Sequence, residues 1–486
     1  MSDRTVGSAN LPDDAEHSLK SNALRFVGTI ANSIGLQAPS ASVAFAPALM
    51  AAIVGTAGPF TFGVSVILML FVAFAFSIFT RQFASAGSVY AFNGRALGSN
   101  YGFVSAWILS FVYLGFVCES TAITADFCQQ LLDSAGIHNF PWPVIAVGLW
   151  GVAMLLAHRS VTVSSEIIFI LEGVAVVLIA IVAVAVVVKG GHGGTGPSWT
   201  PLTNAGAGLS TIALGVVFAF SGFAGFEVAA TFGEESAKAT RMITAAIFGS
   251  LIVSGLIYTV FAWIETIAIP EKQLAASSVP LLDITRLYLN PTLAVIINIA
   301  IIISGYGATL AGVNGVTRLL FALSRDGFGA RWLATTHKVH RSPSGALYLT
   351  AGLSMVGLIV LFHATAINAT FEFATYAADL ILVAYLLTVV AAFVWSLRHR
   401  SGAPPVISLA ILAIGAIVLG YVIKNSVYPV PASPFNICMY LAGATIAAGI
   451  VVLAVSPSLR RQLASSPVFA GQTASAENSP AAESSR

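Results

Sequence analysis

The sequence predicts an all-α polytopic membrane protein with twelve transmembrane helices: a five-plus-five inverted repeat with broken helices 1 and 6, plus two additional helices. Three observations support this fold class. The 486 residues are 57% hydrophobic and 9% charged, whereas a soluble domain carries about 25% charged residues. The apolar residues gather into stretches of membrane-spanning length. Two of these stretches, around Pro39 and Gly225, are interrupted by helix-breaking residues.

Twelve apolar stretches are candidate spans, because a spanning helix needs about 20 mostly apolar residues. They cover residues 27–50, 60–79, 101–132, 143–157, 162–188, 210–231, 243–268, 290–315, 345–362, 369–395, 405–425 and 434–455. Eleven spans are the main alternative to this count.

The spans are expected to form a single transmembrane domain over residues 23–456. An odd number of spans in each half inverts the second half relative to the first. The expected parts are repeat one at 27–188, repeat two at 210–395 and extra helices at 405–455. The polar, Ser- and Ala-rich ends, 1–22 and 457–486, are expected to be disordered cytoplasmic tails.

The distribution of Lys and Arg predicts the orientation in the membrane. With the N-terminus inside, most of the 22 basic side chains fall on the cytoplasmic side, and the other side keeps Lys189, Lys272, Arg286 and Lys424. The positive-inside rule therefore places both termini of a multi-pass protein of the cytoplasmic membrane in the cytoplasm. Acidic residues before the first apolar stretch argue against a cleavable signal peptide.

Composition argues against several other classes of protein. The net charge is +2, and its basic residues are scattered over loops, which is not a nucleic-acid-binding pattern. The cysteines Cys118, Cys128 and Cys438 lack metal-binding spacing, and no cofactor motif or catalytic nucleophile set appears. We therefore expect no enzyme, cofactor or metal site. A membrane enzyme or a channel is the alternative from another class, and the sequence carries no signal for an oligomeric state.

The first interruption lies in the segment 33–42, SIGLQAPSAS. Proline lacks a backbone N–H and disfavours helix at the residue before it. A helix restarting near Ser42 would present free N–H groups that suit a carboxylate. The candidate substrate-binding residues here are Ala38, Pro39, Ser40, Ala41 and Ser42.

The second interruption lies in the segment 218–236, FAFSGFAGFEVAATFGEES. Free carbonyls at such a break accept hydrogen bonds from an ammonium group, so the two breaks together suit a zwitterion. The alternative for both is a proline kink and a glycine-rich packing face. The candidate residues are Phe220, Ser221, Gly222, Phe223 and Ala224, with Tyr376 and Phe223 as possible gates over the substrate.

Carboxylates within the spans are costly and therefore mark functional sites by default. Glu227 follows the second break, where desolvation favours the neutral form and suits proton uptake and release; its alternative is a protonated carboxyl that only bonds the unwound backbone. Glu265 and Asp126 lie near helix ends and are expected to reach the interface. Thr309 is a candidate ion contact on the eighth span, with packing as its alternative.

Three motifs resemble those of the amino acid–polyamine–organocation permeases. Ser85-Ala86-Gly87-Ser88-Val89-Tyr90 is similar to P-x-[AG]-G-x-Y, with Ala84 in place of proline. Gly225-Phe226-Glu227 followed by Gly233-Glu234-Glu235 resembles G-F-[DE] then A-E-E. Thr317-Arg318 with Ala322 to Gly327 resembles R-x-x-x-A-x-[AS]-R-D-G. The resemblance covers about residues 25–460. One departure is Pro39-Ser40-Ala41, which stands where many members have G-[ST]-G.

The resemblance implies the five-plus-five fold and transport of amino acids or related amines. It places Glu172 where the cationic amino acid branch usually has lysine, so Glu172 could hold a proton, pair with a cation or face the substrate ammonium. It places Glu119 and Asp379 on walls of the side-chain pocket, where each could favour a cation or only bond a neighbouring helix. The expected function is import of an amino acid or small amine, coupled to protons through Glu227 and Glu172. Exchange without net ion coupling is the alternative.

Overall fold

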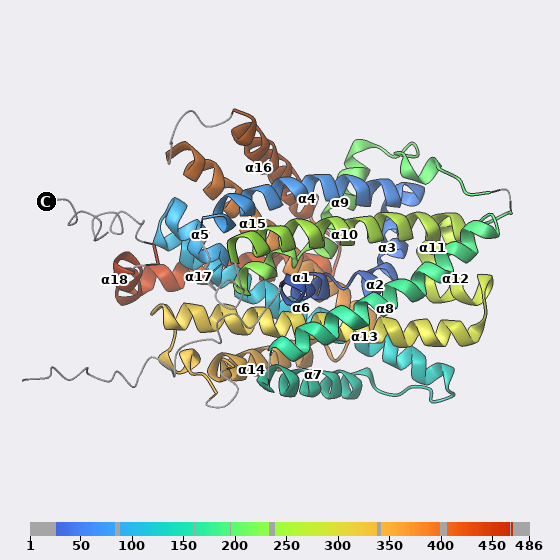
Figure 1. Cartoon of the computed structure of the whole chain (residues 1–486), viewed down its shortest axis with the longest axis horizontal. Helices are drawn as coiled ribbons and strands as arrows, with labels where there is room; N and C mark the ends of the chain where they lie inside the picture. Colours follow the sequence, from blue (N-terminus) through green and yellow to red (C-terminus); the bar gives the residue numbers. More distant parts are fainter. Residues whose placement is uncertain are drawn as a thin grey trace, which may run out of the picture.

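The computed structural model describes residues 26–82, 88–159, 161–194, 196–232, 239–337, 342–398, 406–466 and 468–469. Every regular element in these residues is helical (Figure 1). The first half contains α1 (Phe26–Gln37), α2 (Pro39–Val43), α3 (Ala46–Val54), η1 (Gly55–Ala57), α4 (Gly58–Thr80), α5 (Ser88–Leu97), α6 (Ser99–Ser134), α7 (Trp142–Arg159) and α8 (Val161–Val188).

A connection that includes η2 (Thr200–Leu202) joins the two halves. The second half contains α9 (Leu209–Phe223), η3 (Phe226–Phe232), α10 (Ala239–Ala268), α11 (Glu271–Ala276), α12 (Pro280–Tyr288), α13 (Pro291–Arg325), η4 (Arg331–Ala334), α14 (Ser344–Leu361) and α15 (Ala366–Arg398). The last elements are α16 (Val406–Val427), α17 (Phe435–Val455) and α18 (Pro457–Ser465).

Eleven helical stretches of the described residues are long and apolar enough to cross a membrane, which confirms the all-α polytopic class. One of them, Ala46–Thr80, joins α3 to α4. The predicted first span, 27–50, is divided between α1, α2 and α3. The count of twelve spans and the inverted repeat stay predictions.

The long helices lie side by side along the longest axis of the molecule, and α6 and α13 run through its interior (Figure 1). α6 packs against both α13 and α15, and α1 lies against α8, α10 and α13. Peripheral helices turn apolar side chains outward: Val177 on α8 is 64% exposed and Ile417 on α16 is 72% exposed. Since exposed apolar helix faces are unfavourable in water, this surface fits the hydrocarbon of a bilayer.

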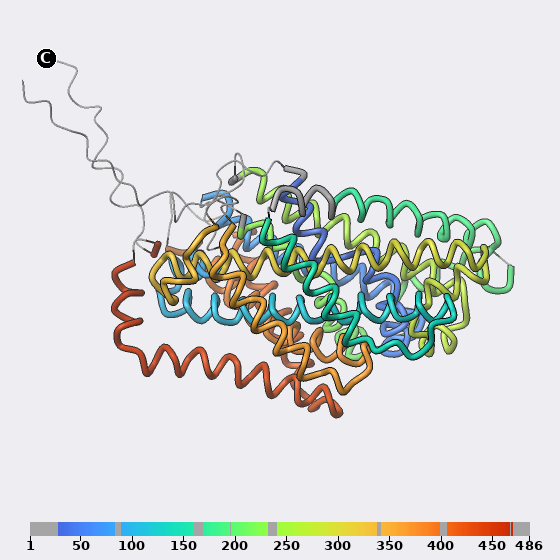
Figure 2. The backbone as a smooth tube through the Cα atoms, turned by 90° about the horizontal axis from the view of Figure 1, so that it is seen from below, coloured from blue at the N-terminus to red at the C-terminus, as the bar shows by residue number. Residues whose placement is uncertain are grey.

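The described part of the C-terminal segment is folded. Figure 2 shows α17 along one side of the bundle and α18 turning at its end. Leu463 of α18 is fully buried, and the ring of Phe469 stacks on Phe328 at a centroid distance of 5.5 Å. The expectation of a disordered tail from residue 457 onward is therefore wrong for 457–466 and 468–469. The ends 1–22 and 470–486 lie outside the described residues.

Candidate substrate and ion site

A single residue carries the first break. α1 ends at Gln37 and α2 begins at Pro39, and between them Ala38 has φ 38° and ψ 61°, in the left-handed region. Proline is suited to the first position of a helix because its missing N–H would have no helical partner there. The helix restart expected near Ser42 therefore lies at Pro39 instead.

The backbone donors of this restart bond to the protein itself. The N–H of Ser40 donates to Glu172 Oε1 at 2.8 Å, and the N–H of Ala41 donates to Ser304 Oγ at 3.2 Å. The N–H of Ser42 bonds within its own turn at 2.9 Å. Glu172 comes from α8 and is only 4% exposed. The donors expected to be free for a substrate carboxylate thus already have acceptors.

The second break needs glycine. α9 ends at Phe223, Ala224 is extended, and Gly225 has φ +105° before η3 begins. A side chain is strained at this φ, and a Cβ here would lie 2.8 Å from Leu36 Cγ. The two breaks therefore touch each other through the end of α1.

Some carbonyls of the second break also have partners. The N–H of Ala224 lies 3.1 Å from Phe220 O and 3.2 Å from Ser221 O. The amide Nε2 of Gln37 donates to Phe223 O at 3.3 Å. A carbonyl oxygen has two lone pairs, so each of these carbonyls keeps capacity for one further donor.

A tyrosine hydroxyl bridges the two breaks. Tyr258 of α10 places its hydroxyl 2.7 Å from Gln37 O and 2.8 Å from Gly222 O. Its ring packs on Phe223 at a centroid distance of 5.1 Å. Tyr258 therefore ties the end of α1 to the end of α9.

Glu227 accepts three hydrogen bonds from three parts of the chain. Tyr113 of α6 donates to Oε1 at 3.1 Å, and Tyr385 of α15 donates to Oε2 at 2.6 Å. The N–H of Gly225 also donates to Oε2, at 2.9 Å. Glu227 is completely buried. Its carboxylate therefore joins the second break to α6 and α15.

Thr309 lies in a separate group of hydroxyls. It is fully buried on α13 and donates to Ser120 Oγ of α6 at 3.0 Å. Among the described residues, no hydrogen bond joins Thr309 to Glu172 or Glu227. The three predicted coupling residues thus do not form one cluster.

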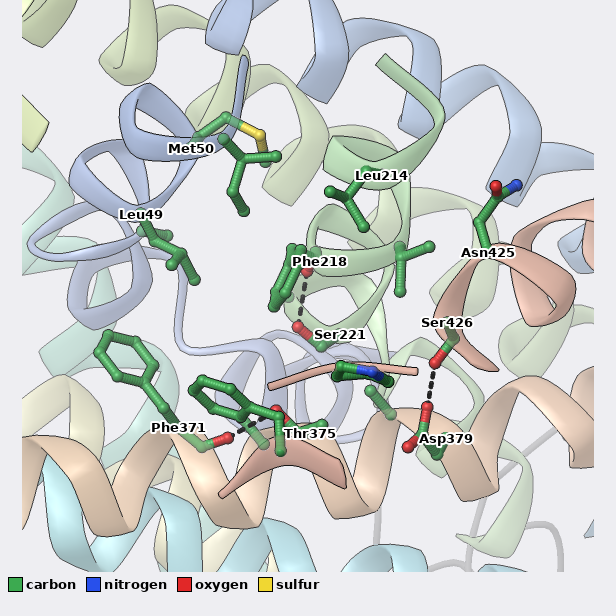
Figure 3. A pocket seen from close by; sticks show the side chains of 18 of the residues that line it. Leu49, Met50, Leu214, Phe218, Ser221, Phe371, Thr375, Asp379, Asn425 and Ser426 are labelled. Atoms are coloured by element: carbon green, nitrogen blue, oxygen red, sulfur yellow. Dashed lines mark hydrogen bonds between the residues drawn. The ribbon is translucent and has the colours of Figure 1, made fainter. Parts of the chain in front are cut away.

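A cavity of about 720 Å³ lies beside the breaks, between α3, α9, α15 and the connection from α16 to α17 (Figure 3). A smaller cavity of about 50 Å³ lies at the breaks themselves. Both are lined by Ser42, Phe45, Glu119, Ser221 and Gly222. The smaller cavity also touches Ala38, Ala41 and Ala224. Pro39, Ser40, Phe220 and Phe223 line neither cavity.

The two acids of the cavity walls differ in their partners. Asp379 of α15 accepts a hydrogen bond from Ser426, drawn in Figure 3. Glu119 of α6 has no hydrogen-bond partner among the described residues. Tyr376 does not line the large cavity, because it lies on another side of α15, where its hydroxyl bonds Thr445 at 3.0 Å.

Glu265 on α10 does not reach an interface. Its side chain is fully buried, and neither carboxylate oxygen has a partner within the part of the chain that the structure describes. The expectation of a solvated end position is wrong, because α11 and α12 cover this end of α10. Asp126 is half-buried and accepts from Gln130 at 2.6 Å.

Two of the three sequence motifs meet in the fold. Tyr90 of α5 donates its hydroxyl to Asp326, just after α13. Motif residues 85–87 and 233–235 lie outside the described residues. The partners Tyr113, Tyr258 and Tyr385 were missed from sequence, although a hydroxyl within an apolar span is a usable signal.

Comparisons with known proteins agree with this architecture. The sequence profile of the family described as amino acid permease matches residues 24–454. The branched-chain amino acid permease BcaP of Bacillus subtilis is 27% identical over 63% of this chain and 68% of its own length. The low-affinity putrescine importer PlaP of Escherichia coli is 24% identical over 62% of this chain and 66% of its own length.

Two further matches bear on direction and on fold. The L-methionine/branched-chain amino acid exporter YjeH of Escherichia coli is 28% identical over 74% of this chain and 84% of its own length. A crystal structure of a manganese transporter from Eremococcus coleocola superposes with a TM-score of 0.55 at 11% identity, covering 93% of this chain and 99% of that chain, which is a likeness of fold. Because the family profile matches nearly the whole sequence, this chain belongs to the amino acid permease family of membrane transporters.

Proposed function

We propose that this protein is a secondary active transporter that imports an amino acid or a related small amine across the cytoplasmic membrane by alternating access. The observation that carries the proposal is the pair of broken helices, which touch at Leu36 and Gly225 and face a cavity. Paired breaks at mid-membrane are the usual substrate site of such carriers. Import rather than export is the finer part of the proposal, since relatives of both kinds are known.

We propose proton coupling through Glu227, with Glu172 as the second candidate. A carboxylate that accepts three donors is well satisfied as an anion. Among the described residues, Oε1 accepts only from Tyr113 and therefore keeps a lone pair for a proton. A proton on Glu227 would remove its negative charge, which weakens the three hydrogen bonds from Tyr113, Tyr385 and Gly225. The proton would thereby loosen the second break from α6 and α15, which couples protonation to movement.

We also propose Thr309 as a contact for a metal cation, in contrast to the proton proposed for Glu227. Its hydroxyl oxygen lies 3.0 Å from Ser120 Oγ and 3.5 Å from Thr121 Oγ1. Oxygen groups of this type ligate hard cations, so a cation would be the alternative coupling ion. Uptake driven by a sodium gradient and lost in Thr309→Val would favour this alternative.

The test of the function is transport by purified protein in liposomes. With an inward proton gradient, we expect accumulation of at least one labelled amino acid or amine, and collapse of that accumulation by a protonophore. Exchange without coupling predicts counterflow that the protonophore does not change. The absence of both uptake and counterflow across a broad panel would exclude a transporter of these substrates.

A further inference from the structure

The backbone donors expected to bind a substrate carboxylate bond to side chains of the protein instead. At the first break, the N–H of Ser40 points at Glu172 Oε1, 2.8 Å away, and the N–H of Ala41 is used by Ser304. Glu172 is nine-tenths buried or more, at 4% exposure. A substrate carboxylate at this position would be repelled by the carboxylate of Glu172, and the N–H donors of Ser40 and Ala41 would already be occupied. Both effects disfavour binding of a substrate that carries a carboxylate.

The small cavity at the breaks offers acceptors. Gln37 is 3% exposed and lines this cavity. Its Nε2 donates to Phe223 O, which leaves Oε1 as the buried end without a partner among the described residues. Glu119 lines the same cavity and also lacks a partner there. A buried acceptor without a donor is costly, so Oε1 of Gln37 favours a ligand that brings N–H groups. The partly exposed carboxylate of Glu119 adds a negative charge that favours a cation.

The large cavity has the same character. Asp379 lines it, and its Oδ2 has no partner in the described residues. Neither cavity is lined by any Lys, Arg or His among the residues that the structure describes. The walls are otherwise largely apolar and include Phe45 and Phe371. The space therefore suits a short hydrocarbon chain with a positive charge.

We propose, building on the transport function proposed above, that the substrate is an alkylamine or diamine without an α-carboxylate. Glu172 occupies the anion position at the first break in place of a substrate carboxylate. The ammonium group of the substrate is held by Glu119 and by Oε1 of Gln37. In a diamine, the second ammonium lies along the cavity toward Asp379.

The first experiment compares pairs of compounds that differ by one carboxylate. Calorimetric binding to the purified protein would be measured for 1,4-diaminobutane against ornithine and for 3-methylbutylamine against leucine. In each pair we expect the amine to bind at least about tenfold more tightly, since rejecting one buried like charge is worth that factor or more. Tighter binding of the amino acid in both pairs would overturn the proposal.

The second experiment removes the carboxylate at the first break. Glu172→Gln keeps the shape without the charge, and Glu172→Ala empties the position. We expect both to reduce the preference for the amine, and Glu172→Ala to bind ornithine and leucine better than the unmodified protein does. An unchanged preference ratio in folded Glu172 variants would also contradict the proposal, and thermal unfolding reports whether they fold.

The third experiment removes the partner of the ammonium. Glu119→Gln should weaken binding of 1,4-diaminobutane by about tenfold, which is the effect of losing one charge-assisted hydrogen bond. The same variant should not increase the affinity for ornithine. Asp126→Asn is the matched control, because it removes an acid from the same helix that lines neither cavity. Equal effects of both variants would count against the site. Amino acid transport in liposomes without amine binding would refute this inference and leave the transport function standing, whereas transport of neither class would refute both.

Discussion

At the scale of single residues, Glu227 is the side chain with the most consequential partners. It is fully buried and accepts from Tyr113, Tyr385 and Gly225. Removing one partner of a buried, hydrogen-bonded charge usually costs several kcal/mol. Glu227 must therefore be tested by a change that keeps its shape.

Glu227→Gln should abolish uptake driven by the proton gradient while it preserves part of the exchange. The amide cannot take up a proton, so only the coupled step loses its group. We expect gradient-driven accumulation to fall by at least about tenfold relative to counterflow. The measurement is both assays on the same liposomes. A parallel loss of uptake and exchange would make Glu227 a structural residue.

Ala38 offers a test of backbone strain. Its φ of 38° is unfavourable for any residue with a Cβ. Ala→Gly in a regular helix costs about 1 kcal/mol, as expected for Ala180→Gly in α8. Ala38→Gly should cost less than this control or increase stability. Thermal unfolding in detergent compares the two, and a larger loss at position 38 would contradict the strained conformation.

At the scale of elements, α18 brings the C-terminal segment back to α5. The ring of Phe469 packs against Tyr90 and Phe328, and Arg95 Nε donates to Val468 O at 2.7 Å. The ring of Phe469 lies directly against Gly94, where a Cβ would come 2.0 Å from Phe469 Cε1. Glycine at this position is therefore explained by the ring that covers it.

Gly94→Ala should displace Phe469 and lower stability by about 1–3 kcal/mol, the usual cost of overpacking. In a Phe469→Ala background, the same substitution should cost little, since the clashing ring is gone. Gly102→Ala is the control, because its Cβ would lie 2.9 Å from Phe469 Cε1 but also 2.8 Å from the backbone oxygen of Tyr90 and 2.9 Å from Gly94 Cα. Most of its cost should persist in the Phe469→Ala background, because the two backbone contacts remain. Additive effects for Gly94 would mean that Phe469 is not seated there.

At the scale of the whole molecule, the positive-inside rule predicts which loops lie on the cytoplasmic side of the membrane. In a protein with Cys118, Cys128 and Cys438 replaced by Ala, a cysteine would be placed at Thr203 or at Thr335, both of which are exposed. A membrane-impermeant maleimide should label position 203 in intact cells and position 335 only after lysis. The reverse pattern would invert the proposed orientation.

Much of the architecture is readable from sequence, because bilayer thickness forces apolar stretches into helices. The ends of α6 and α8 lie within a few residues of their predicted ranges. Local patterns do not report long-range contacts. Nothing near Glu172 in sequence indicates that it bonds Ser40, and nothing in the span 369–395 indicates which side of the helix holds Tyr376.

The order of the C-terminal segment could not be predicted from sequence for a related reason. Its small polar residues are typical of disorder, whereas its contacts with α5, with α6 and with the residues after α13 favour an ordered arrangement. Local composition could not reveal a contact made by one aromatic ring at residue 469.

The seating of Phe469 also decides where this protein can be shortened. A form ending at residue 456 would keep every candidate span, yet it would uncover Gly94 and Gly102 and remove the carbonyl that Arg95 contacts. A shortened form should therefore keep at least the residues through 469. Affinity tags and fluorescent fusions belong beyond that residue, and hydropathy alone would place the cut too early.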